Sequence, residues 1–200
     1  MNNYTYTVRN GIYINLTNRC TNRCTFCIRN EGAGVYGSDS LWLDREPTAK
    51  EVLDDLGKYD FSKYNEVVFC GYGEPTIRIE ELCEVARGIK SMCSLPIRIN
   101  TNGQGNLIHG RDITPMFEGI VDIVSISMNT ADAESYAEVC KPAYGEAAYQ
   151  AVLDFGLCAS KHVPEVIFSV VRTTIPDEDI EKCRVLAEKY GGKLRVRELD

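Results

Sequence analysis

The chain has 200 residues, enough for one sizeable hydrophobic core, and we expect a single domain over residues 1–200. Hydrophobic residues make up 44% and charged residues 26%, which is typical of globular proteins and excludes disordered, collagenous and coiled-coil classes. The net charge of -7 argues against extended nucleic-acid binding and against attachment to anionic membranes, because both need a surplus of Lys and Arg.

The first residues of the chain do not have the pattern of an export signal. Residues 1–10 are polar and have no cationic stretch leading into an apolar run, so we expect no secretory signal. No apolar run approaches the ~20 residues that a membrane span needs. We therefore expect a cytoplasmic protein, whose nine cysteines serve metal binding, redox chemistry or packing rather than a disulfide framework.

Strand-like and helix-like segments alternate along the chain. The predicted strands span residues 11–17, 66–70, 96–101, 121–128, 166–172 and 194–199. The predicted helices lie near residues 49–56, 79–89, 148–155 and 180–187, with weaker helical patterns at 112–118 and 132–140. Asp177 is the expected N-cap of the last long helix, and Gly191 is its expected end.

This alternation predicts the fold class. Strands that are apolar on both faces and separated by helices indicate a parallel sheet with right-handed crossovers, so the class is α/β. A closed eight-unit barrel takes about 250 residues, so six units suit either a partial, open barrel or a doubly wound sheet. In both folds, ligands bind at the carboxyl ends of the strands.

Three cysteines follow the first predicted strand with the spacing CxxxCxxC, at Cys20, Cys24 and Cys27. Three thiolates on one loop can converge on a metal centre. Structural zinc normally takes four protein ligands, and Cys70 is then the candidate for the fourth. Four cysteines close every iron of a cubane iron-sulfur cluster against substrate, whereas three leave one iron open to a chelating amino acid.

These residues resemble the hallmark of the radical S-adenosylmethionine (radical SAM) superfamily, which has CxxxCxxC after the first barrel strand and an aromatic residue before the last cysteine. Phe26 occupies the aromatic place. More narrowly, residues 11–30 and the GYGEPT run at 71–76 are similar to small radical SAM proteins associated with TatD-type hydrolases. The resemblance implies a partial (βα)6 TIM-like barrel with parallel strands, and a 4Fe-4S cluster held by the three cysteines.

The resemblance also implies contacts to S-adenosylmethionine (SAM). A glycine-rich segment looks like the one that contacts the methionine amino group in the family, with a tyrosine in place of one glycine; it comprises Gly71, Tyr72, Gly73, Glu74 and Pro75. Ribose and carboxylate contacts are expected near the ends of later strands, and the candidates are Asn100, Thr101, Ser127, Asn129 and Arg172. Ser127 is the first candidate for the ribose. The open alternatives are plain turn residues and a solvated rim arginine.

Other residues near the triplet are candidates for supporting roles. Arg19, Arg23 and Arg29 either stabilise a negatively charged cluster, dock an electron donor or remain solvated loop charges. The segment 31–45 holds the single Trp42 and could form a lid. Five further cysteines are interpreted as packing residues: Cys83, Cys93, Cys140, Cys158 and Cys183.

The function that the resemblance implies is reductive cleavage of SAM to methionine and a 5′-deoxyadenosyl radical, which takes a hydrogen atom from an unidentified small-molecule or protein substrate. A flavodoxin- or ferredoxin-type electron donor is implied, and a TatD-type hydrolase is a candidate partner. The alternatives are an iron-sulfur electron carrier or redox sensor without SAM chemistry, and a zinc-stabilised binding module. Among enzymes, a glycyl-radical activating enzyme and a small-molecule modifier, including one similar to 7-carboxy-7-deazaguanine synthase, both stay open.

Overall fold

The computed structural model describes residues 2–30, 40–172 and 175–198. Its strands form one seven-stranded sheet in the order β1-β2-β3-β4-β5-β6-β7. The strands are β1 (Thr5–Val8), β2 (Gly11–Ile14), β3 (Glu66–Phe69), β4 (Ile97–Thr101), β5 (Ile123–Ser127), β6 (Glu165–Val171) and β7 (Lys193–Arg197). Strands β2 to β7 pair in parallel, and β1 pairs antiparallel with β2.

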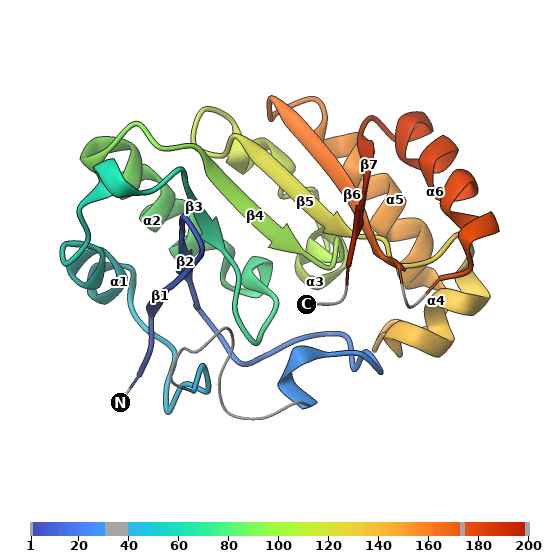
Figure 1. Cartoon of the computed structure of the whole chain (residues 1–200), viewed down its shortest axis with the longest axis horizontal. Helices are drawn as coiled ribbons and strands as arrows, with labels where there is room; N and C mark the ends of the chain where they lie inside the picture. Colours follow the sequence, from blue (N-terminus) through green and yellow to red (C-terminus); the bar gives the residue numbers. More distant parts are fainter. Residues whose placement is uncertain (1, 31–39, 173–174, 199–200) are drawn as a thin grey trace.

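The strand order decides between the two predicted architectures. A doubly wound sheet reverses its strand order at a switch point, whereas here spatial order follows chain order throughout. Figure 1 shows the resulting curved sheet with the long helices on its outer side. The α/β class and the partial, TIM-like barrel are therefore confirmed.

Helices follow the strands and cover the sheet. The longer helices are α1 (Ala49–Leu56), α2 (Ile79–Met92), α5 (Ala147–Ala159) and α6 (Asp177–Lys189). The shorter ones are α3 (Gly105–His109), α4 (Ala133–Cys140) and the 3-10 turns η1 (Ile28–Asn30), η2 (Phe61–Lys63), η3 (Pro75–Arg78) and η4 (Thr114–Phe117). Of the helices in the described residues, none combines the length and apolar character needed to cross a bilayer.

Helix α1 illustrates how the sequence sets an element. Thr48 accepts a hydrogen bond from the backbone of Glu51, and the Glu51 side chain accepts one from the backbone of Thr48, which forms a capping box. Ala49, Val52 and Leu56 then place one apolar face against the core.

The main hydrophobic core lies between the sheet and the helices. Alternate strand residues enter it, such as Ile12 and Ile14 of β2 and Val67 and Phe69 of β3, and all four are fully buried. We call this the outer face of the sheet. The intervening residues form the inner face, which is markedly more polar and points into the partial barrel.

The structure corrects several expectations. Strand β1 was not predicted, and it makes the sheet mixed rather than wholly parallel. Asp177 is the first residue of α6 and not its cap, because Pro176 occupies the N-cap position. The weak helical pattern at 112–118 is only the 3-10 turn η4. Helix α3 was also missed, since its five residues carry no apolar periodicity.

Candidate functional site

The cysteine triplet lies on the irregular segment that follows β2. Figure 1 shows this segment, in blue, along the side of the sheet at which the strand arrows end. Cys20, Cys24 and Cys27 are half-buried free thiols. Burial and the nearby Glu74 carboxylate raise the pKa of Cys20 to about 11. Metal binding must therefore displace a proton from this thiol at neutral pH.

Backbone hydrogen bonds hold the segment on two sides. The Glu74 N–H donates to the carbonyl of Arg19 over 2.8 Å, which ties the triplet to the loop after β3. The Arg23 N–H donates to the carbonyl of Cys140 over 3.0 Å, which ties it to the end of α4. Two elements that are distant in sequence thus fix the position of the ligand loop.

A buried polar network supports the triplet from within. The Asn22 amide donates to the Tyr136 hydroxyl over 3.0 Å, and the Gln104 amide donates to Asn22 Oδ1 over 2.7 Å and to the Tyr136 hydroxyl over 3.1 Å. Burial raises the pKa of Tyr136, so its hydroxyl stays protonated. Gln104 and Tyr136 were not predicted as site residues, because neither belongs to a local motif.

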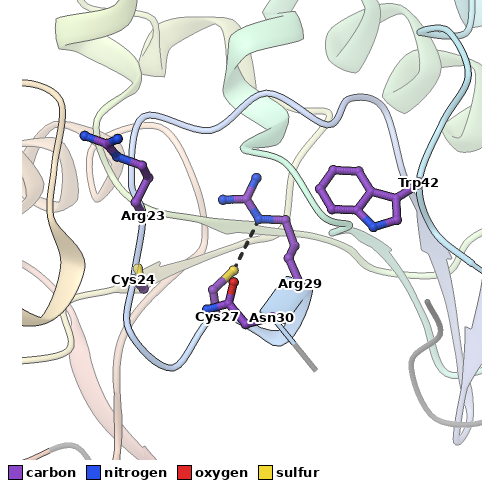
Figure 2. A pocket seen from close by; sticks show the side chains of 6 residues that line it. All are labelled: Arg23, Cys24, Cys27, Arg29, Asn30 and Trp42. Atoms are coloured by element: carbon purple, nitrogen blue, oxygen red, sulfur yellow. Dashed lines mark hydrogen bonds between the residues drawn. The ribbon is translucent and has the colours of Figure 1, made fainter. Parts of the chain in front are cut away.

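A cavity of about 260 Å³ opens beside two of the cysteines. Figure 2 shows its lining: Arg23, Cys24, Cys27, Arg29, Asn30 and Trp42. Arg29 Nε donates to Cys27 Sγ over 3.3 Å. Arg19 does not join this group, because Glu46 binds its guanidinium through two hydrogen bonds of 2.6 and 2.9 Å.

The three cysteines of the triplet fit a cubane iron-sulfur cluster in which one iron has no protein ligand. Among the described residues, no three Cys, His, Asp or Glu side chains are gathered to hold a single metal ion. A cubane spreads its three ligands over three separate irons, so it does not require sulfurs gathered around one ion. The guanidinium of Arg29 at Cys27 supplies positive charge where thiolates would accumulate negative charge.

Cys140 has an unexpected contact for a residue interpreted as packing. It is fully buried, and its thiol forms a hydrogen bond with that of Cys24, which raises the pKa of Cys24 and lowers that of Cys140. Asn129 Nδ2 also donates to Cys140 Sγ over 3.2 Å. Cys70, the zinc alternative's fourth ligand, instead lies on the inner face near Asn100, and burial raises its pKa.

The glycine-rich segment after β3 packs tightly against the triplet loop. A Cβ added at Gly73 would lie 2.3 Å from the Thr17 carbonyl oxygen, and one at Gly71 would lie 2.1 Å from Asn15 Oδ1. These glycines therefore permit close approach of the chain to itself. Tyr72 is buried beside Trp42, with ring centroids 5.0 Å apart, and Pro75 is buried in η3.

Glu74 is enclosed by hydrogen-bond donors. Its carboxylate accepts from Thr76 Oγ1 at 2.6 Å, from Thr101 Oγ1 at 2.7 Å and from the backbone N–H of Asn102 at 2.6 Å. Burial nevertheless raises its pKa. The Glu74 side chain thus joins the glycine-rich segment to the end of β4, and the Thr101 hydroxyl is one of the donors in this contact.

Asn102 links this contact to the triplet, and it was not among the predicted site residues. Its Nδ2 donates to Thr21 Oγ1 over 2.8 Å and lies 3.9 Å from Cys20 Sγ. Asn100, which was predicted, accepts a hydrogen bond from Arg98 over 2.7 Å on the inner face.

Two predicted residues lie at the end of β5. Ser127 is half-buried on the inner face. Asn129 has a φ of 65°, in the left-handed region, and is 2% exposed. Its Oδ1 is one of three buried side-chain atoms without a hydrogen-bond partner among the described residues. An orphaned acceptor at this place is open to a ligand donor.

The last two predicted residues, Phe26 and Arg172, have different surroundings. Phe26 is half-buried within the triplet loop. Arg172 is an exposed residue whose guanidinium pairs with Glu198 at 2.9 Å and with Asp177 at 3.3 Å. Most of the predicted lid, residues 31–39, lies outside the described residues.

The sequence matches the family model of the radical SAM superfamily over residues 14–187. The chain belongs to this superfamily. Its members bind a 4Fe-4S cluster and SAM, and they need an electron donor and a substrate. Family membership favours the cluster over the zinc alternative for the triplet.

The curated relatives are larger proteins. A GTP 3′,8-cyclase from Lactiplantibacillus plantarum is 26% identical over 162 residues, covering 80% of this chain and 45% of the relative. A GTP 3′,8-cyclase from Corynebacterium glutamicum is 28% identical, covering 96% of this chain and 49% of the relative. The chain thus spans about half the length of these relatives.

Solved structures share the fold. SuiB from Streptococcus suis, bound to its precursor peptide SuiA, has a TM-score of 0.70 at 14% identity and covers 98% of this chain and 40% of its own. HydG, a maturase of the FeFe-hydrogenase, has a TM-score of 0.68 at 14% identity, covering 95% of this chain and 42% of its own. At these identities the likeness establishes the fold alone.

Proposed function

We propose that residues 1–200 form a single radical SAM core whose cluster is held by Cys20, Cys24 and Cys27. The observation that carries this proposal is the placement of three free, half-buried thiols on one loop, beside a cavity lined by arginine. Family membership supports it independently of the geometry.

When bound, the cluster and SAM supply one electron and a 5′-deoxyadenosyl radical for abstraction of a substrate hydrogen atom. The chain's own residues hold and orient these groups. Arg29 neutralises charge at Cys27, while Asn22 and Glu74 fix the loop through the contacts described above.

SAM would lie between the glycine-rich segment and the ends of β4 and β5. Its proposed contacts are the backbone of residues 71–75 and the side chains of Ser127 and Asn129. The unpartnered Asn129 Oδ1 supports this placement, because a ribose hydroxyl could donate to it. Asn100 and Phe26 are proposed neighbours. Thr101 and Glu74 act by shaping the segment.

The substrate is a small molecule or a protein side chain. The relatives named GTP 3′,8-cyclase make a nucleotide one candidate, although the chain spans only about half of their length. The basic residues Arg23 and Arg29 at the cavity suit an acidic flavodoxin or ferredoxin as electron donor. Association with a TatD-type hydrolase and a cytoplasmic location stay predictions.

The decisive experiment is anaerobic reconstitution with iron and sulfide, followed by reductant and SAM and an assay for 5′-deoxyadenosine. We expect slow cleavage without substrate, loss of both cluster and cleavage in Cys24→Ala, and retention of both in the control Cys183→Ala, because Cys183 is a buried residue of α6. Cleavage that persists in Cys24→Ala would refute the cluster assignment. A wild-type cluster that never binds or cleaves SAM would favour the electron carrier or redox sensor.

A further inference from the structure

The inner face of β7 presents two arginines toward the partial barrel. Leu194 and Val196 pack against the main core on the outer face. Side chains alternate along a strand, so Arg195 and Arg197 belong to the inner face. Both are exposed.

Two ion pairs lie on this face. Arg98 binds both carboxylate oxygens of Glu66, at 2.9 and 2.6 Å, and Lys193 binds Glu165 at 2.7 Å. Within the ranges that the structure describes, no carboxylate pairs with Arg195. Arg195 therefore brings a positive charge to the inner face that none of the described carboxylates neutralises, in a chain whose net charge is -7.

The strand register places Arg195 close to the proposed SAM site. Ser127 of β5 lies opposite Ser169 of β6, which lies opposite Arg195 of β7, so the three residues form one row across the sheet. Ser169 is 2% exposed and forms the floor of this row, whereas Ser127 and Arg195 are accessible.

The curvature of the sheet brings the end of β7 toward β3. Arg197 is near enough to Cys70, at the end of β3, to lower the pKa of its thiol against the stronger effect of burial. A molecule inside the partial barrel would thus face Cys70 and Asn100 on one side and the two arginines on the other.

This chemistry recognises an oxyanion. A guanidinium donates two parallel hydrogen bonds to phosphate or carboxylate, so a single arginine can bind either group. Building on the proposed function, we propose that the substrate carries a phosphate or carboxylate group, which Arg195 binds on the inner face beside the SAM site.

The test is calorimetric titration of the reconstituted protein with pyrophosphate and, separately, with glutarate. Saturating SAM is present so that the probes cannot bind at the place where the carboxylate of SAM binds. The variants are Arg195→Gln, which removes the charge, and Arg195→Lys, which keeps the charge but loses the planar fork. Arg184→Gln is the matched control, because Arg184 is exposed on α6 and its ion pair among the described residues is with Glu181.

We expect Arg195→Gln to weaken binding of one probe by about tenfold or more, Arg195→Lys to weaken it less, and Arg184→Gln to leave it unchanged. The probe that responds identifies the substrate group as phosphate or carboxylate. If neither affinity depends on Arg195, or if Arg195→Gln weakens SAM binding instead, the proposal is overturned.

Two controls separate the possible failures. Thermal unfolding of Arg195→Gln checks that the variant is folded. The titration requires no SAM cleavage, so Arg195-dependent anion binding by a wild-type protein that forms no 5′-deoxyadenosine would count against the proposed function alone.

Discussion

The thiol of Cys140 forms a hydrogen bond with the thiol of Cys24, the middle cysteine of the triplet. An iron-bound Cys24 has no proton to donate, so the Cys140 S–H must then be the donor. Hydrogen bonds to cluster sulfurs stabilise the more negative, reduced state and raise the reduction potential. We therefore expect Cys140, a buried residue of α4, to make it easier for a cluster held at Cys24 to accept an electron.

Cys140→Ala should assemble the cluster but give it a more negative reduction potential than the wild type. Cys140→Ser keeps a donor and should shift the potential less. Redox titration followed by electron paramagnetic resonance measures both, with Cys83→Ala as the buried control on α2. Equal potentials in the wild type and Cys140→Ala would rule out this role.

Gly73→Ala should displace the triplet loop. The added Cβ would meet two backbone carbonyl oxygens, at 2.3 Å from Thr17 and 2.6 Å from Arg19, and neither can move like a flexible side chain. Such overpacking costs about 1–3 kcal/mol. We expect a lower free energy of unfolding in urea and less iron bound per chain.

Gly110→Ala is the control for this variant. Gly110 has a φ of 61° and open space around its Cα, so alanine there costs about 1 kcal/mol through backbone strain alone. It should reduce stability without reducing iron loading. Equal iron loss in both variants would mean that general destabilisation, not the loop contact, controls cluster assembly.

Glu74 should make stability depend on pH. Burial raises its folded-state pKa above the ordinary value near 4.5, so between these two values the folded protein binds more protons than the unfolded chain. The free energy of unfolding should therefore fall as pH rises through this window and level off above it. Urea unfolding at a series of pH values measures the slope.

Glu74→Gln cannot ionise and should remove this decline, whatever its effect on absolute stability. Glu134→Gln, at an exposed position on α4, should keep the wild-type slope. An unchanged slope in Glu74→Gln would show that the donors around the carboxylate outweigh its burial.

Trp42 should report cluster assembly optically. It is the single tryptophan, is 45% exposed and lines the same cavity as Cys24 and Cys27. A light-absorbing cluster bound to these cysteines would lie near the tryptophan, so it should quench the tryptophan fluorescence strongly during reconstitution. Cys183→Ala should show the same quenching and Cys24→Ala none; full emission in a cluster-loaded wild type would place the cluster elsewhere.

Arg172→Gln should leave SAM affinity unchanged, because its guanidinium is occupied by Asp177 and Glu198 at an exposed position. Ser127→Ala should weaken SAM binding by about two- to tenfold, as expected for one lost hydrogen bond. Equilibrium binding to the reconstituted protein compares the two. A larger loss in Arg172→Gln would restore the contact implied by the family resemblance.

The periodicity of the sequence predicted most of the fold because β2 to β7 and the longer helices have apolar patterns set by the main core. Strand β1 escaped prediction because it is a four-residue edge strand with mixed burial, and its pairing depends on β2. Strand order does not follow from local patterns, so the sequence alone is compatible with both a partial barrel and a doubly wound sheet.

The candidate site was only partly predictable for the same reason. The triplet was visible because its three cysteines are local in sequence. Its supports were not, since Gln104, Tyr136 and Cys140 reach the loop only through tertiary packing. The close approach of the chain's own backbone at Gly73 was also hidden from the sequence, because it too depends on tertiary packing.

The anchoring of the triplet loop bears on how the protein matures. Small zinc domains gain their fold from the metal itself and are unfolded without it. Here the loop is bonded to the β3 loop, to α4 and to Gln104 through contacts that include no metal. Iron delivery can therefore follow chain folding as a separate event, and an iron-starved cell would accumulate a folded precursor ready to be filled.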